Sequence, residues 1–125
     1  MINVDRVLQR SPRFQRFASV KEISHFAESL KKSPGFKVRK IGRSPTGHPI
    51  HHVCFGAGKI KALFGGLTTL SLMRLLRDGN RELIDADVEW HIVPCADPDG
   101  AMLNEGWSLK PFSFSRFMQF YFRLS

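Results

Sequence analysis

One stretch, residues 87–107, constrains the fold of this chain more than any other, because a strand-forming segment in it runs directly into a polar turn. Residues 88–93 (Val-Glu-Trp-His-Ile-Val) are rich in β-branched and aromatic side chains, which favour a β-strand. Pro94 and the sequence Asp-Pro-Asp-Gly at 97–100 then end this strand with residues typical of turns. In open α/β sheets, ligands bind at the loops that follow the carboxyl ends of strands. We therefore predict a candidate site at this turn, with Asp97 and Asp99 in its floor.

The size and composition are those of one globular domain. The chain has 125 residues, of which 42% are hydrophobic and 24% charged. No run approaches the roughly 20 apolar residues of a membrane span. The first ten residues lack the apolar core of a secretory signal. We expect a cytoplasmic protein without a transmembrane segment.

The formal net charge is +8, and the basic residues gather mainly in residues 1–43 and 110–125. Such a charge attracts nucleic acid, anionic membrane surfaces or acidic substrates. Here the basic residues are scattered over expected loops, helix ends and one strand, and no nucleic-acid-binding motif accompanies them. A solvated basic surface is the favoured interpretation, with no clear nucleic-acid partner.

A capping box predicts that a helix starts at Ser19, since Ser19 and Glu22 have the spacing at which each side chain bonds the other's backbone N–H. Apolar residues then follow at helical spacing: Ile23, Phe26, Ala27 and Leu30. Pro34 and Gly35 end this helix. His25 and Glu28 in it have the His-x-x-Glu spacing of a zinc-ligand pair. Both are expected to point away from the apolar face, so we interpret them as a solvent-exposed pair.

Two strands, residues 36–41 and 50–55, are expected to form an antiparallel pair because a short loop dense in turn formers joins them. Side chains alternate along a strand, so His51 and His52 point to opposite faces, one half-buried and one in solvent. Cys54 and Cys95 lie at or near apolar strands without metal-type spacing, and we expect them to be buried, reduced thiols.

The next segment predicts a strand, a glycine pair and a helix in direct succession. Residues 56–59 (Gly-Ala-Gly-Lys) do not match a phosphate-binding loop, which needs Gly at 53 and Ser or Thr at 60. Residues 60–64 form an apolar strand that leads into Gly65 and Gly66. A helix is expected from the spacing of Leu67, Leu70, Met73 and Leu76, and a brief helical turn from residues 81–84.

Three motifs, at residues 41–50 (IGRSPTGHPI), 62–66 (ALFGG) and 93–100 (VPCADPDG), resemble motifs of the zinc carboxypeptidases, and they stand in the family's order. The resemblance covers roughly residues 36–107. It implies an α/β fold with a mixed, partly parallel sheet flanked by helices, present here as an incomplete, amino-terminal part. The family-motif scaffold positions are Gly65, Gly66, Asp97, Pro98, Asp99 and Gly100.

The family resemblance further implies hydrolysis of C-terminal peptide bonds by a zinc-activated water, with a peptide as substrate. In the family, a His-x-x-Glu pair of ligands follows the glycine pair, whereas this chain has Leu67 and then Thr-Thr-Leu at 68–70. No His follows His91, and Asn104 is followed by Glu105 rather than by the arginine that grips a substrate carboxylate in well-known members. We transfer no catalytic and no metal-binding residue: zinc is expected for the family but not for this chain. Asp97 and Asp99 are then better explained as turn formers than as a catalytic pair.

These departures predict an inactive fragment or decayed copy, in which a loop between Gly66 and Leu67 and the distal half are missing. We divide the chain into a basic lead-in arm (1–18), a partial carboxypeptidase-like α/β domain (19–107) and an aromatic, basic tail of a truncated domain (108–125). The tail is interpreted as core material left uncovered, or alternatively as a segment that lies on a membrane or stacks on single-stranded nucleic acid. The alternative function is a non-catalytic basic domain that binds an anionic partner.

Overall fold

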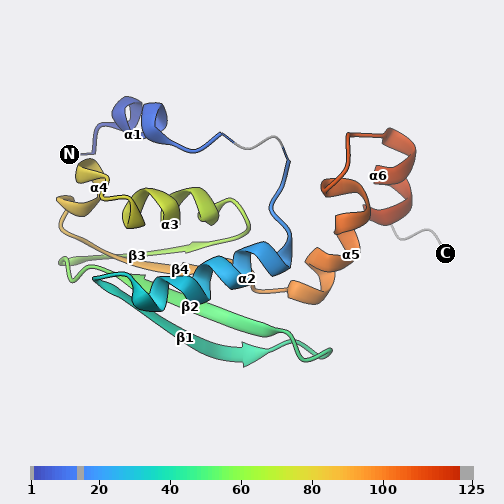
Figure 1. Cartoon of the computed structure of the whole chain (residues 1–125), viewed down its shortest axis with the longest axis horizontal. Coiled ribbons are helices and arrows are strands. Elements are labelled where there is room, and N and C mark those ends of the chain that lie inside the picture. Colours follow the sequence, from blue (N-terminus) through green and yellow to red (C-terminus); the bar gives the residue numbers. More distant parts are fainter. Residues whose placement is uncertain (1, 14–15, 122–125) are drawn as a thin grey trace.

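The computed structural model describes residues 2–13 and 16–121 and contains a four-stranded sheet with helices over one of its faces (Figure 1). The strands are β1 (Phe36–Arg43), β2 (Pro49–Phe55), β3 (Ile60–Gly65) and β4 (Val88–Val93). They lie in the order β1-β2-β4-β3. β2 is antiparallel to both of its neighbours, and β3 is parallel to β4. The predicted mixed, partly parallel sheet and the antiparallel pair of its first two strands are confirmed.

Six α-helices are found in the described residues: α1 (Val4–Arg10), α2 (Val20–Ser29), α3 (Thr69–Arg77), α4 (Arg81–Ile84), α5 (Pro98–Ser108) and α6 (Phe114–Tyr121). A 3-10 turn, Leu30–Lys32, extends α2. The capping box is present, since the Glu22 N–H donates to Ser19 Oγ at 3.1 Å and the Ser19 N–H donates to Glu22 Oε2 at 2.7 Å. None of the described helices is long and apolar enough to cross a membrane.

The hydrophobic core lies between the sheet and the two helices α2 and α3. Val53 on β2 and Ile92 on β4 are fully buried beneath these helices, and they face each other across the two strands. The helices contribute the expected apolar faces, which include Ile23, Ala27 and Leu30 from α2 and Leu70, Met73 and Leu76 from α3. The helical spacing in the sequence therefore predicted the core-facing residues of both helices correctly.

The first and last of the described helices, α1 and α6, pack against α4 and α5, respectively. Asn3 and Arg6 at the start bind the Glu82 carboxylate of α4, through an N–H···O bond and an ion pair, each at 3.2 Å. At the other end, α6 folds back on α5 beyond the end of the sheet (Figure 1). Phe117 of α6 meets the Trp107 ring of α5 edge-on, with 5.0 Å between the ring centres. Residues 114–121 of the aromatic tail thus form a helix, and Phe117 in it covers part of the apolar surface of α5.

His25 is exposed as expected, whereas Glu28 is only partly exposed, at 34% of its side chain. Glu28 lies over the sheet, where its Oε1 atom is 2.8 Å from Nε2 of His51, a residue that is only 5% exposed. Lys31 holds the other carboxylate oxygen at 2.6 Å. His51 and His52 do point to opposite faces of β2, but both are more enclosed than predicted, because His52 stacks on a ring of β4.

This arrangement predicts how the stability of the chain depends on pH. The hydrogen bond from Lys31, followed by that from His51, lowers the pKa of Glu28 from 4.5 to about 2. A carboxyl group with a depressed folded-state pKa stabilises the fold above its unfolded pKa and loses that contribution as the pH falls toward the folded value. Since the side chain is 34% exposed, solvent screening reduces the contribution to about 1 kcal/mol.

We therefore expect Glu28→Gln to be about 1 kcal/mol less stable than the wild type at pH 7, with the difference vanishing between pH 5 and pH 2. Urea unfolding followed by circular dichroism at each pH measures both chains. Other carboxyl groups titrate in both, so the difference isolates Glu28. A difference in stability between the two chains that stays constant from pH 5 to pH 2 would contradict the lowered pKa of Glu28.

The face of the sheet opposite α2 and α3 carries no helix among the described residues (Figure 1). The outer strand β3 exposes large apolar side chains: Leu63 is 73% exposed on this face, and Ile60 is 61% exposed at the start of the strand. No strand of the described residues pairs with the outer edge of β3, and such an apolar edge favours association with further chain segments.

Candidate functional site

The three sequence motifs come together at one edge of the sheet, where β1, β3 and β4 all end. Gly65 at the end of β3 pairs with Val93 at the end of β4, and the Gly66 N–H donates to the Val93 carbonyl at 3.2 Å. The β1–β2 loop lies at the same edge, because β1 is antiparallel to β2 and β2 to β4. Carboxyl ends of strands are the usual position for ligands in such sheets, so this edge is the candidate site.

The interpretation of residues 97–100 as a turn outside any helix is wrong, because they begin helix α5. Asp97 caps that helix, and its Oδ1 accepts the Gly100 N–H at 2.9 Å. Pro98 occupies the first helical position, where its fixed φ angle suits a helix and no backbone N–H is needed. An Asp-Pro pair can therefore signal a helix start as well as a turn.

Asp99 connects this helix start to the β1–β2 loop. Its carboxylate accepts hydrogen bonds from the Ser44 hydroxyl at 2.6 Å, the Thr46 hydroxyl at 2.5 Å and the Thr46 N–H at 3.1 Å. The Ser44 hydrogen bond, and then that of Thr46, lower the pKa of Asp99 below its ordinary value. The residue therefore stays ionised and acts as a clamp between two motifs, which argues against a proton-transfer role.

β3 enters α3 almost directly. Gly66 has a φ of +104°, a conformation that favours glycine, and it turns the chain from the strand toward the helix. The Thr69 hydroxyl donates to the Gly66 carbonyl at 2.7 Å and tightens this junction. Only Leu67 and Thr68 stand between the glycine pair and the helix.

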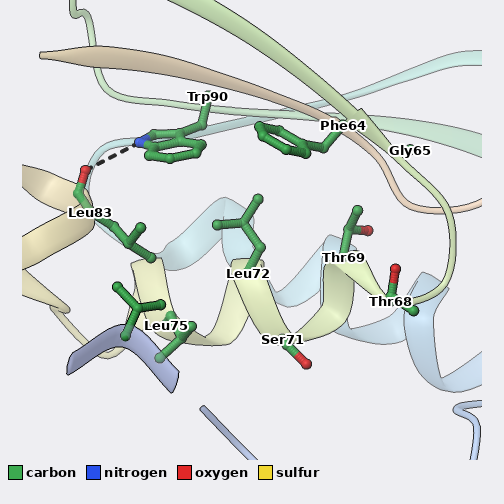
Figure 2. A pocket seen from close by; sticks show the side chains of 10 residues that line it. Phe64, Gly65, Thr68, Thr69, Ser71, Leu72, Leu75, Leu83 and Trp90 are labelled. Atoms are coloured by element: carbon green, nitrogen blue, oxygen red, sulfur yellow. Dashed lines mark hydrogen bonds between the residues drawn. The ribbon is translucent and has the colours of Figure 1, made fainter. Parts of the chain in front are cut away.

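A pocket of about 330 Å³ lies beside this junction, between α3 and the end of β3. Figure 2 shows Leu72 pointing from α3 toward the rings of Phe64 and Trp90, which form the opposite wall. The Trp90 indole N–H donates to the Leu83 carbonyl at 3.3 Å and is thereby satisfied within the pocket wall. The pocket is mainly apolar, and its polar side chains are hydroxyls: Thr68, Thr69 and Ser71.

The donors at this junction do not fit the zinc ion that the family resemblance implies. Protein zinc sites use Cys sulfur, His nitrogen and Asp or Glu oxygen. Neither the described residues that line the pocket nor Leu67 and Thr68 supply such a group. No catalytic step can therefore be derived through a zinc ion at the end of β3.

Two further positions singled out in the sequence have structural partners. Asn104 Oδ1 accepts the indole N–H of Trp107 at 3.3 Å within α5. Glu105 Oε1 accepts the Val20 N–H at 2.8 Å and so ties α5 to the start of α2, whose unpaired N–H groups favour a negative charge. These contacts position α5 relative to the core.

The cysteines differ from the sequence-based expectation, since both are only partly buried. Burial raises the pKa of each thiol above its ordinary value. Cys54 in addition lies beside Glu89 and His91 of the neighbouring strand. Spacing along the sequence could not reveal this group, because its members meet only through strand pairing.

No protein-family profile matches the chain, and no curated protein is found to be similar to it. Solved structures do match. Carboxypeptidase A from Helicoverpa armigera has a TM-score of 0.62 and 24% identity over 72% of this chain. A putative carboxypeptidase A from Shewanella denitrificans has a TM-score of 0.57 and 16% identity over 89%. A metallo-carboxypeptidase from Burkholderia cenocepacia has a TM-score of 0.56 and 21% identity over 71%.

The aligned part is 27%, 36% and 29% of those three chains, respectively, so this chain spans about a third of their length or less. The sheet, its flanking helices and the three motifs at one edge agree with this likeness. The chain has the fold of part of a metallocarboxypeptidase.

Proposed function

We propose that this chain is a carboxypeptidase-type scaffold that does not hydrolyse C-terminal peptide bonds as it stands. The observation that carries the proposal is the junction between β3 and α3. There the chain passes from Gly66 through Leu67 and Thr68 into a helix whose pocket-lining polar groups are hydroxyls. A zinc-activated water needs an ion held by stronger donors than these.

The other motif residues support a scaffold role in this proposal. Asp97 caps α5, and Asp99 clamps the β1–β2 loop through Ser44 and Thr46. A general acid or base must be free to exchange a proton with the substrate, whereas Asp99 is held ionised by three hydrogen bonds. The peptide substrate of the related enzymes is thus proposed not to be turned over by this chain.

The test is a C-terminal hydrolysis assay on the purified chain, supplied with zinc. Peptides with different C-terminal residues are incubated and analysed by mass spectrometry, with an active zinc carboxypeptidase as positive control. We expect every peptide to stay intact at the rate of the blank. Release of the C-terminal residue that requires zinc and stops on chelation would contradict the proposal.

The second candidate function is binding of an anionic partner. It is favoured by Lys37 and Arg39, which are exposed on β1 and form no ion pair with a carboxylate of the described residues. Binding to nucleic acid or to anionic lipid vesicles that weakens steeply with added salt would support this function. No binding at low salt would exclude it.

A further inference from the structure

The helix-free face of the sheet carries a compact group of three side chains of the types that bind metal ions in proteins. Cys54 of β2 pairs with His91 of β4 across the two strands, and Glu89 lies two residues before His91 on the same face. One ligand atom from each of these three residues lies within 4.8 Å of the other two. The side chains of Glu89 and His91 are 21% and 26% exposed, so an ion can reach them from solvent.

We propose that Cys54, Glu89 and His91 form a zinc-binding site on the helix-free face of the sheet. A sulfur, an imidazole nitrogen and a carboxylate oxygen are the donors that zinc takes in proteins, whereas calcium and magnesium prefer oxygen ligands. Three protein ligands leave a fourth tetrahedral position for water. The site is independent of the proposed function, which concerns the end of β3.

The ligand atoms of this group lie near the separations that a bound zinc ion requires. Zinc bonds of about 2.0–2.3 Å place neighbouring ligand atoms roughly 3.3–3.8 Å apart. Nε2 of His91 is already 2.7 Å from Oε1 of Glu89. A proton now joins these two atoms, and a bound zinc ion would replace it between them. Small side-chain rotations on the two paired strands are therefore sufficient to bring the three ligand atoms around one ion. The thiol proton of Cys54 is released to solvent when the sulfur binds.

His52 supplies the support that a metal-binding histidine needs. Its Nε2 atom lies 3.0 Å from Nδ1 of His91, and the two rings are stacked with 15° between their planes. Nε2 of His91 can bind the ion only in the tautomer that carries the ring proton on Nδ1, so binding moves this proton from Nε2 to Nδ1, and the Nδ1–H then donates to the unprotonated Nε2 of His52. A hydrogen bond of this kind fixes the orientation of a ligating imidazole. His52 is a positioning residue in this site.

A cysteine nucleophile is the other chemistry that such a group could offer, and the contacts argue against it. Both ring nitrogens of His91 are within hydrogen-bond distance of other groups, Glu89 and His52, so neither is directed at the Cys54 thiol as a base. Lys61, the cation beside Glu89 at 3.7 Å, is 73% exposed and can move away when an ion enters.

The test uses the full chain, without a polyhistidine tag and with its thiols reduced. Zinc affinity is measured by competition with a chromophoric chelator, and circular dichroism checks the fold of each variant. We expect one zinc ion per chain in the wild type. Cys54→Ser and His91→Ala should each weaken binding by about tenfold or more, and His52→Ala by about tenfold with the stoichiometry unchanged.

Matched controls are Cys95→Ser, the other partly buried cysteine, and His25→Ala, an exposed histidine on α2. Both should bind zinc as tightly as the wild type. The proposal is overturned if the wild type binds no zinc, if Cys54→Ser keeps the wild-type affinity, or if the controls lose binding equally. If His91→Ala does not fold, the nearly isosteric Cys54→Ser variant tests by itself whether zinc binds at this site. Because binding is measured directly, failure here leaves the peptidase test unaffected.

Discussion

Replacing Ile92 by Ala should lower the free energy of unfolding by about 3 kcal/mol, measured by urea denaturation. Ile92 is fully buried near the carboxyl end of β4, between Val53 of β2 and Phe64 of β3. Removing three carbon atoms there loses their burial and leaves a cavity that two packed helices cannot readily fill. For a domain with a typical stability of about 5–15 kcal/mol, this is a large fraction of the total.

Leu63→Ala is the matched control, because it removes the same number of atoms from the neighbouring strand β3 but at a side chain that is 73% exposed. Its effect should stay within about 0.5 kcal/mol. Equal losses in the two variants would mean that the core does not lie between the sheet and the helices α2 and α3.

Gly58→Ala should destabilise the chain by about 3 kcal/mol, or prevent folding, because there is no space for the added methyl group. A Cβ atom at Gly58 would overlap backbone atoms of Asp87 and Val88 at the start of β4. Backbone cannot give way as a side-chain end can. The same turn holds β3 in place, since the N–H of Ile60 donates to the Asp87 carbonyl at 3.1 Å.

Gly42→Ala provides the comparison. A Cβ there would meet only the end of the Ile50 side chain, at an ordinary contact distance of 3.9 Å, and Gly42 does not have a positive φ angle. We expect its free energy of unfolding to change by less than about 0.5 kcal/mol. If Gly58→Ala unfolds at the wild-type midpoint, the close approach of this turn to β4 is contradicted.

Much of the fold could be predicted because its signals are local. The capping box at Ser19 and Glu22 predicted the start of α2, and a short loop dense in turn formers between two expected strands predicted the β1–β2 pair. Residues 97–100 were recognised as a motif but assigned the wrong structure. Asp and Pro are turn formers, and they are equally suited to the cap and first position of a helix, which local composition cannot distinguish.

The contacts that could not be predicted join residues far apart in the sequence. Glu28 reaches His51 only because α2 crosses β2, and Cys54 meets His91 only because β4 lies next to β2 in the sheet. Metal-ligand spacing rules find pairs within one helix or loop and miss ligands on paired strands. The aromatic tail did contain a local signal, since Phe114, Phe117 and Tyr121 are spaced as on one side of a helix.

The central claim is that the end of β3 holds no zinc. Zinc supplied to the chain is instead proposed to bind on the helix-free face of the sheet, opposite α2 and α3. X-ray absorption spectroscopy at the zinc edge tests this most directly on the zinc-loaded chain. We predict a ligand shell that includes one sulfur at about 2.3 Å, retained in Cys95→Ser and lost in Cys54→Ser. A shell of nitrogen and oxygen donors alone in the wild type, together with zinc-dependent release of C-terminal residues from peptides, would contradict the claim.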